Sequence, residues 1–363
     1  MSWNDVKLDE VILFKNGKKR PIGTGKFPVY GGNGILGYAD SPNNRNCVIV
    51  GRVGAYCGSV YYEDGDCWIS DNAICALPKG ENDIIFLYYL LKSLELNKRH
   101  IGTSQPLLTQ EILNSIVCKI PAKDTQFKIG RLLRTLDEKI AVNQKINDNL
   151  LDQMQALYKS WFVDFLPFDG VRPESWTKTD IYSLANIIYG APFASKQFNA
   201  AGEGKPIIRI RDLKDQQFAT YTTEVHPKGY LLQPGDIVVG MDGEFRPYIW
   251  GNDEAWLNQR VCVFENKRPN GKAFLYFTIK PLLYSIEQTQ VATTVIHIGK
   301  KDYDAFEITL PDTTTLDNFD ALTSPMIMQI VSNSFENKRL SSMRDALLPK
   351  LMSGEIDVSS IQL

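Results

Sequence analysis

Few of the side chains that support metal and nucleophile chemistry occur in this sequence of 363 residues. Its three histidines, His100, His226 and His297, stand in unrelated contexts, and its six cysteines include no Cys-x-x-Cys pair. A structural zinc site normally uses closely spaced cysteines, often together with histidines. We therefore expect no metal site, and we expect the cysteines to be unpaired thiols in a reducing compartment.

Short motifs of several enzyme classes are also absent. There is no Gly-x-x-x-x-Gly-Lys phosphate loop, no acidic-Pro-Pro-aromatic segment of amino-methyl transfer and no Gly-x-Ser-x-Gly nucleophile turn. Two Gly-x-Gly pairs, Gly23–Gly25 and Gly202–Gly204, lack the third glycine and the following helix of a dinucleotide site, so they predict turns. We expect no catalytic residue and no cofactor in this chain.

Long apolar runs are missing as well. No segment approaches the roughly 20 apolar residues that span a bilayer, and the N-terminus lacks a secretory pattern, so we expect a cytoplasmic protein without membrane contact. The net charge of −2 argues against indiscriminate nucleic-acid binding. Any nucleic-acid surface must then be a local patch.

What the sequence does contain is an internal repeat. Landmarks of the first half recur in the same order in the second half, while the polar positions between them change. The corresponding segments are Trp3 and Trp176, Val48–Gly54 and Ile237–Gly243, Trp68–Asn72 and Trp256–Arg260, Phe86–Lys92 and Phe274–Lys280, and Ile120–Pro121 and Leu310–Pro311. With 44% hydrophobic residues, each half can bury its own core.

After each of the two prolines the apolar period changes from strand-like to helical. We therefore predict four segments: a domain over 1–121, a long helix over 122–166, a second domain over 167–311, and a second long helix with a tail over 312–363. The fold class is mixed α/β (α+β). One chain with two similar but unequal domains is expected to bind two different targets.

The long helices carry a heptad seam with asparagines at its centre. The seam residues are Leu133, Leu136, Ile140, Asn143, Asn147 and Leu150 in the first helix and Ile330, Asn333, Asn337 and Leu340 in the second. A seam asparagine lowers stability but fixes register, because only a polar partner satisfies it. Antiparallel pairing as a coiled coil would place the asparagines opposite one another, with pseudo-two-fold symmetry. The alternative is that each helix only covers its own domain.

Apolar residues near the ends of these helices exceed what a two-stranded seam can bury. They are Trp161, Phe162, Phe165, Leu348 and Leu351. We interpret them as an interface for a partner protein. The alternative interpretation is that each helix end packs under its neighbouring domain.

Arginine and lysine near the strand and helix landmarks are the candidates for DNA contact, because arginine suits guanine edges and phosphates and glutamine suits adenine. Arg209 and Arg211 are expected to alternate along a strand and so to share one face. The full candidate set is Lys18, Lys19, Arg20, Arg45, Arg52, Lys98, Arg99, Gln105, Arg209, Arg211, Lys214, Arg246, Arg260, Thr293 and Thr294.

Taken together, the layout resembles the specificity (S) subunit of type I restriction-modification systems over essentially the whole chain. The resemblance is carried by the motifs at Tyr30–Tyr38, Trp68–Ala73, Gly102–Thr109, Trp161–Phe165 and Leu347–Gly354. The second copy departs from the first, because it has Ile208–Leu213 where the first has the Tyr-Gly-Gly-Asn-Gly stretch. This departure implies a differently built surface.

The resemblance implies two target recognition domains, each binding one half of a bipartite double-stranded DNA site, with the paired helices as a spacer that sets the gap. It implies methyltransferase (modification) subunits and restriction/ATPase subunits as partners, which would carry out the catalysis. An alternative function from another class is a non-enzymatic protein-binding scaffold without DNA recognition. The near-neutral charge is the best support for that alternative.

Overall fold

The computed structural model describes residues 3–102, 105–289 and 297–361. Two compact units form the chain: the first comprises residues 1–139 and 340–363, and the second comprises residues 140–339. Thr293 and Thr294, two of the candidate DNA-contacting residues, lie outside the described residues.

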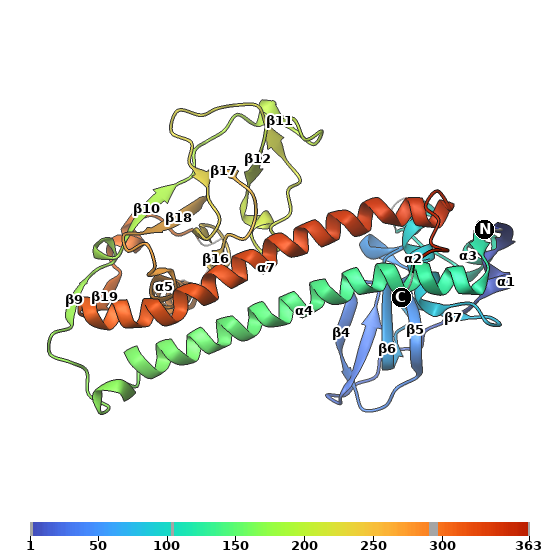
Figure 1. Cartoon of the computed structure of the whole chain (residues 1–363), viewed down its shortest axis with the longest axis horizontal. Coiled ribbons are helices and arrows are strands. Elements are labelled where there is room, and N and C mark those ends of the chain that lie inside the picture. Colours follow the sequence, from blue (N-terminus) through green and yellow to red (C-terminus); the bar gives the residue numbers. More distant parts are fainter. Residues whose placement is uncertain (1–2, 103–104, 290–296, 362–363) are drawn as a thin grey trace. The chain divides into compact units, whose positions relative to one another are not determined.

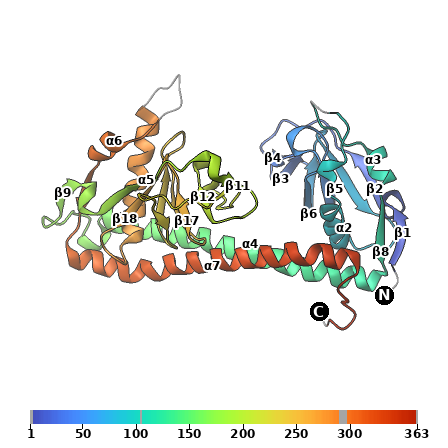
Figure 2. The same cartoon turned by 90° about the horizontal axis from the view of Figure 1, so that it is seen from above.

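The first unit is built on a six-stranded sheet with the order β2-β7-β5-β6-β3-β4, whose central strands are visible in Figure 1. Helices α2 and α3 contact this sheet (Figure 2), and β1 and β8 form a separate antiparallel pair. The elements are β1 (Trp3–Lys7), α1 (Leu8–Val11), β2 (Ile12–Asn16), β3 (Phe27–Gly31), β4 (Gly34–Ala39), β5 (Asn44–Gly51), β6 (Val60–Ile69), β7 (Ala73–Pro78), α2 (Ile84–Ser93), α3 (Gln110–Ser115) and β8 (Val117–Pro121).

The second unit contains two sheets, with the orders β10-β18-β15-β16 and β11-β13-β12-β17-β14, and an antiparallel pair β9-β19. The elements are β9 (Thr177–Asp180), β10 (Ala185–Tyr189), β11 (Phe198–Asn199), β12 (Lys205–Ile208), β13 (Tyr221–Thr222), β14 (Leu231–Leu232), β15 (Ile237–Gly240), β16 (Pro247–Ile249), β17 (Ala255–Leu257), β18 (Val261–Asn266), α5 (Lys272–Thr289), α6 (Lys300–Asp304) and β19 (Glu307–Leu310).

The strand pairing repeats between the units. Antiparallel β2-β7-β5 corresponds to β10-β18-β15, the parallel pair β3-β6 corresponds to β12-β17, and β1-β8 corresponds to β9-β19. In the first unit the long strand β6 pairs with both β5 and β3, and it therefore joins β2-β7-β5 and β3-β4 into one sheet. The second unit replaces β6 with the short strands β16 and β17, which is why its sheet is divided. The predicted mixed α/β class and the repeat are confirmed.

Two long helices contribute residues to both units: α4 (Lys123–Phe162) has 40 residues and α7 (Thr313–Ser353) has 41. In the first unit Leu133 of α4 and Leu351 of α7 are completely buried in the core. In the second unit Met154 of α4 and Phe319 of α7 are completely buried in the other core. Each helix therefore supplies core residues to both units, so neither helix only covers the domain that precedes it.

Within the second unit, α4 and α7 contact each other through the predicted asparagines. Asn143 Nδ2 donates to Asn337 Oδ1 at 2.9 Å and to Glu336 Oε2 at 2.7 Å, and Asn333 Nδ2 donates to Asn147 Oδ1 at 2.8 Å. Residue numbers rise along one helix as they fall along the other, so the helices run antiparallel here, as Figure 1 also shows. The expected opposition of the asparagines is confirmed, while a coiled-coil geometry over the whole length stays a prediction.

Burial follows the predicted seam. Leu133, Asn143, Ile330 and Asn333 are buried, and the remaining seam residues are half-buried. Asn143 is only 1% exposed, which is unusual for an amide and explains why its side chain needs partners on α7. The seam therefore combines apolar packing with two amide pairs that are satisfied only in this register.

Candidate nucleic-acid interface

Backbone hydrogen bonds gather the loops of the first unit at one end of its sheet. We call this surface the loop end of the first unit; it comprises residues 17–22, 31–34, 51–59, 70–73 and the described part of 98–108. The connecting bonds are Lys18 N to Ile69 O, Ser70 N to Tyr30 O, Arg52 N to Asn72 O and Leu108 N to Arg52 O, all between 2.8 and 3.1 Å. Segments far apart in the sequence therefore present their side chains together.

The motifs behind the family resemblance build this loop end. Pairing of Gly31 with Gly34 leaves a two-residue turn between β3 and β4, and Gly34 adopts a φ of +76°, which favours glycine. Tyr30 Oη donates to Glu63 at 2.9 Å beside this turn. Burial and that hydrogen bond raise the pKa of the Tyr30 hydroxyl, so the hydroxyl remains a donor at neutral pH.

The second unit repeats these bonds almost one for one, and its loop end comprises residues 190–197, 209–214, 240–246, 258–261 and 297–299. The corresponding bonds are Ala191 N to Leu257 O, Asn258 N to Ile208 O, Met241 N to Arg260 O and Ile298 N to Met241 O, between 2.8 and 3.3 Å. This one-to-one match shows which positions correspond: Asn72 to Arg260, Val53 to Asp242, and Leu107 to His297.

Close backbone contact beneath both loop ends depends on a glycine. A Cβ at Gly17 would lie 1.9 Å from Ser70 O, and a Cβ at Gly190 would lie 1.9 Å from Asn258 O. The side chains of Ser70 and Asn258 are themselves buried and each has an oxygen without a partner among the described residues. The two units therefore share a framework down to single contacts, and they differ in what the framework displays.

The first loop end displays basic side chains that no described carboxylate neutralises. Lys18, Lys19 and Arg20 are exposed, and Arg20 Nη2 donates to Leu36 O at 2.7 Å. The neighbouring Arg52 is half-buried, and its Nε is buried without a partner among the described residues. Together these side chains concentrate positive charge on one surface, as phosphate contact requires.

The other candidates of the first unit fall into two groups. Gln105, Lys98 and Arg99 are all exposed, although Lys98 is paired with Glu95 at 2.5 Å. Arg45 lies at the opposite end of β5 from Arg52 and is 3.8 Å from Asp66. The structure therefore does not bring Arg45 to the loop end, and its contact with DNA stays a prediction.

The prediction that Arg209 and Arg211 alternate along a strand was wrong. Strand β12 ends at Ile208, and a short 3-10 helix of residues 210–212 follows directly. Arg209 is half-buried and its guanidinium donates to Thr220, whereas Arg211 is exposed. The carboxylate of Asp212 accepts from the backbone of Arg209 at 3.0 Å and stabilises this turn, which periodicity alone could not reveal.

Carboxylates pair with most of the basic candidates in the second unit. Arg246 forms an ion pair with Glu287, whose hydrogen bond raises the pKa of the arginine, and Arg260 lies 3.4 Å from Asp242 Oδ1. Lys214 is exposed near the same loops. Because these ion pairs neutralise part of the positive charge, this loop end presents fewer unpaired lysine and arginine side chains than the first among the described residues.

Two residues at the second loop end were missed by sequence reasoning. His297 Nδ1 donates to Asp242 Oδ1 at 2.6 Å, and both side chains contact Arg260. The structure places His297 opposite Leu107 of the first unit, so the exchange of an apolar residue for a titratable one becomes visible only in the structure. Asp242 gave no sequence signal either, because its partners are distant in sequence.

The apolar helix ends pack inside their own units, which is the alternative interpretation given above. Phe162 contacts Phe274, Phe319 and Trp176, with ring centroids 4.9 to 5.6 Å apart, and Trp161 contacts Phe319. Phe165 packs on Trp176 in the same unit. These three half-buried residues therefore stabilise the second unit.

The same holds for the end of α7 in the first unit. Leu351 is completely buried in the core, and Leu348 is half-buried against it. Both residues therefore stabilise the first unit, as the alternative interpretation expected, and the assignment of the helix ends to a partner interface stays a prediction.

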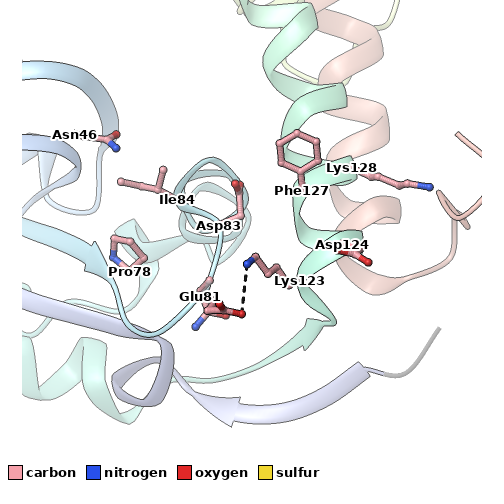
Figure 3. Close-up of a pocket in the computed structure, with 10 residues that line it drawn as sticks. Asn46, Pro78, Glu81, Asp83, Ile84, Lys123, Asp124, Phe127 and Lys128 are labelled. Carbon is pink, nitrogen blue, oxygen red and sulfur yellow. Dashed lines mark ion pairs between the residues drawn. The ribbon is translucent and has the colours of Figure 1, made fainter. Parts of the chain in front are cut away.

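The first unit also contains a cleft of about 630 Å³ whose lining includes no residue of the loop end (Figure 3). It is lined by the start of α2 and the first turns of α4, and an ion pair of 3.3 Å joins Lys123 to Glu81 across it. Among the described residues no group of three or more metal-ligating side chains occurs, and no described helix is long and apolar enough to cross a membrane.

The six cysteines are all buried and unpaired. Burial raises the pKa of the Cys118 thiol to about 11 and that of the Cys262 thiol to about 12, so these two remain protonated and unreactive at neutral pH. They pack as small apolar side chains.

Duplicated units with matched loop ends define a class of protein that presents two related but unequal recognition surfaces. The sequence profile of the type I restriction modification DNA specificity domain matches residues 1–152 and 173–327. Since these ranges cover most of the chain, the chain belongs to this family, and the resemblance inferred from the motifs is confirmed.

Individual relatives agree with this assignment. The chain is 26% identical to the HindI specificity subunit of Haemophilus influenzae, and the match covers 79% of each chain. It is 25% identical to the MjaIX specificity subunit of Methanocaldococcus jannaschii, covering 78% of this chain and 72% of that one. A 37% identical match to the Escherichia coli EcoBI specificity subunit covers 38% of this chain but only 29% of that relative.

A solved structure shows the same fold. The S subunit of a type I restriction-modification system from M. genitalium matches with a TM-score of 0.61 and 18% identity, over 99% of this chain and 97% of that chain. At this identity the match supports the fold alone.

Proposed function

We propose that this chain is the DNA-recognition subunit of a type I restriction-modification complex and binds a bipartite double-stranded site. The loop end of the first unit recognises one half of the site, and the loop end of the second unit recognises the other half. Catalysis belongs to separate methyltransferase and restriction/ATPase subunits, which this chain recruits. The complex acts in the cytoplasm, where its DNA substrate is present.

One observation carries this proposal: the two loop ends share a hydrogen-bond framework but display different side chains. Asn72, Val53 and Leu107 in the first unit correspond to Arg260, Asp242 and His297 in the second. A conserved framework with exchanged surface residues is what two half-sites of different sequence require, because base edges are distinguished by side-chain donors and acceptors.

The first experiment measures the motif. The full chain, assembled with its methyltransferase subunits, selects from a pool of randomised duplexes. We expect enrichment of one split motif, with two specified blocks separated by an unspecified gap. Enrichment of a single contiguous block, or no enrichment at all, would overturn the proposal.

The second experiment separates DNA binding from the protein-scaffold alternative through salt. Log affinity falls linearly with log salt concentration, and each lost phosphate contact makes the slope of this fall shallower by about 0.9. Replacing Lys18 and Lys19 with alanine should therefore weaken DNA binding of the assembled complex and lower this slope by up to about 1.8. An unchanged slope in this variant would show that these two lysines do not contact DNA phosphates.

A matched control removes two charges from the same unit outside the loop end. Lys7 and Lys119 are exposed on the β1-β8 pair, and their replacement with alanine should leave the slope within error of the unmodified complex. An equal loss in both variants would mean that only net charge matters. DNA binding that does not depend on salt in the unmodified complex would favour the protein-scaffold alternative.

A further inference from the structure

The second loop end contains a cluster of three polar side chains that has no counterpart in the first. Arg260 Nη1 lies 2.9 and 3.2 Å from the two ring nitrogens of His297 and 3.4 Å from Asp242 Oδ1. His297 Nδ1 lies 2.6 Å from the same carboxylate oxygen. Since a carboxylate only accepts, His297 donates from Nδ1, and its Nε2 is left as the acceptor for the arginine.

The backbone of Arg260 is held in an uncommon conformation. Its φ is +70°, in the left-handed region that non-glycine residues seldom adopt, and its carbonyl oxygen accepts from Met241 N at 2.8 Å. The corresponding Asn72 in the first unit accepts the matching bond from Arg52 without a positive φ. Backbone strain of this kind persists at functional sites where the surrounding structure enforces it.

The cluster leaves one edge of the guanidinium available. All contacts of Arg260 with described side chains go to Nη1, and its side chain is 54% exposed. Nε and Nη2 therefore remain as a pair of donors on the other edge. Two parallel donors of this spacing match the O6 and N7 acceptors of guanine in the major groove.

The neighbouring charge favours a base over a phosphate as the target. The carboxylate of Asp242 is 30% exposed beside the guanidinium, and it would repel a phosphate brought to the same place. A guanine edge carries no net charge and avoids this repulsion. The carboxylate also fixes the arginine in one orientation, which reduces the rotamer entropy lost on binding.

We propose that Arg260 recognises a guanine in the half-site bound by the second unit, and that Asp242 and His297 are the positioning residues that orient it. This inference rests on the proposed function. Because Asn72, Val53 and Leu107 occupy the three corresponding places in the first unit, the effect is confined to one of the two blocks of the motif.

The test repeats the selection from randomised duplexes with variants of Arg260 in the assembled complex. Arg260→Gly removes the side chain and accepts the positive φ without strain, so it should fold. We expect the preference for guanine at one position of one block to fall by roughly 5-fold to 100-fold, the value of a bidentate arginine contact. The other block and all remaining positions should keep their preferences.

Two further variants separate orientation from charge. Arg260→Lys keeps the charge but lacks the two-donor edge, and it should not restore the guanine preference. Asp242→Asn should weaken the preference at the same position by a smaller factor, because the arginine remains but is less well oriented. Asn72→Ala in the first unit is the matched control and should leave that position unaffected.

The outcomes distinguish this inference from the function on which it rests. If the unmodified complex selects no bipartite motif, the proposed function fails. If it selects one but Arg260→Gly changes no base preference, the inference fails. Uniformly weaker binding with a lower salt slope would identify a phosphate contact instead. Loss of both blocks in Arg260→Gly and Arg260→Lys would also contradict it, because Arg260 would then serve folding.

Discussion

The amide pair between Asn143 and Asn337 makes a quantitative prediction for the contact between α4 and α7. Asn143 is 1% exposed and donates to Asn337 at 2.9 Å and to the carboxylate of Glu336 at 2.7 Å. Replacing Asn143 with leucine removes both hydrogen bonds but adds apolar contact in the seam. Leucine is close to asparagine in length, so packing changes less than polarity does.

The magnitude follows from these two terms. A neutral hydrogen bond contributes about 1 kcal/mol and one to a charged group about 1.5 to 3 kcal/mol, so their loss costs roughly 2.5 to 4 kcal/mol. Burial of the leucine side chain stabilises the folded state by about 1.5 to 2 kcal/mol. We expect Asn143→Leu to lower the free energy of unfolding by about 0.5 to 2.5 kcal/mol.

A double-mutant cycle isolates the amide pair. Asn143→Leu, Asn337→Leu and the double variant are compared by urea unfolding of the full chain. Because the double variant leaves neither amide facing an apolar neighbour, its loss should be smaller than the sum of the single losses by about 1 kcal/mol. Losses that add to within about 0.3 kcal/mol would refute the pairing.

The second amide pair tests the register. The leucine variant of Asn143 and Asn333 disrupts both pairs, and it should keep the helices together while allowing them to slip. Cysteines placed at Leu150 and Ile330, which pack in the same core, should form a disulfide readily in the parent chain. In the variant, a pair shifted by one turn, Leu150 and Met326, should also cross-link. Trapping of only the parent pair would contradict a register role.

Two further predictions concern the framework. Gly17→Ala should lower the free energy of unfolding by about 1 to 3 kcal/mol or prevent folding, because its Cβ would lie 1.9 Å from Ser70 O, whereas Gly32→Ala, with its nearest atoms at 3.6 Å, should cost far less in the same urea assay. Asp312 caps α7, and hydrogen bonds from the Thr315 backbone lead the effects that lower its pKa. A lowered pKa adds stability above the ordinary aspartate value of about 3.9 that is lost as pH falls below it. Unfolding across this range should show a weaker pH dependence in Asp312→Asn, and an unchanged profile would be evidence against the cap.

Pattern and spacing predicted the framework of this protein well. The repeat of glycines and aromatic residues fixed the order of elements, and the asparagines on α4 and α7 predicted their own partners, because heptad position and residue type together decide which side chains meet. Those signals are local or periodic, so they can be recognised in the sequence alone.

Side-chain partners across the tertiary structure could not be predicted. The ion pair of Arg246 depends on Glu287, which lies on another element. The turn after Ile208 depends on a local hydrogen bond to Asp212, which the periodicity of apolar residues does not reveal. The packing of the apolar helix ends near Trp161 and Leu351 could not be predicted either, because the sequence does not show which core each end joins. In each case the contact that decides the structure joins residues that no regular spacing in the sequence connects.

The central claim is that each unit recognises one half of a split DNA site independently. Exchange of residues 173–311 for the corresponding domain of a relative with a different target tests it directly. The motif selected by the assembled chimeric complex should keep the first block and gain a new second block. If both blocks change together, or if neither changes, the two loop ends do not act as separate recognition surfaces.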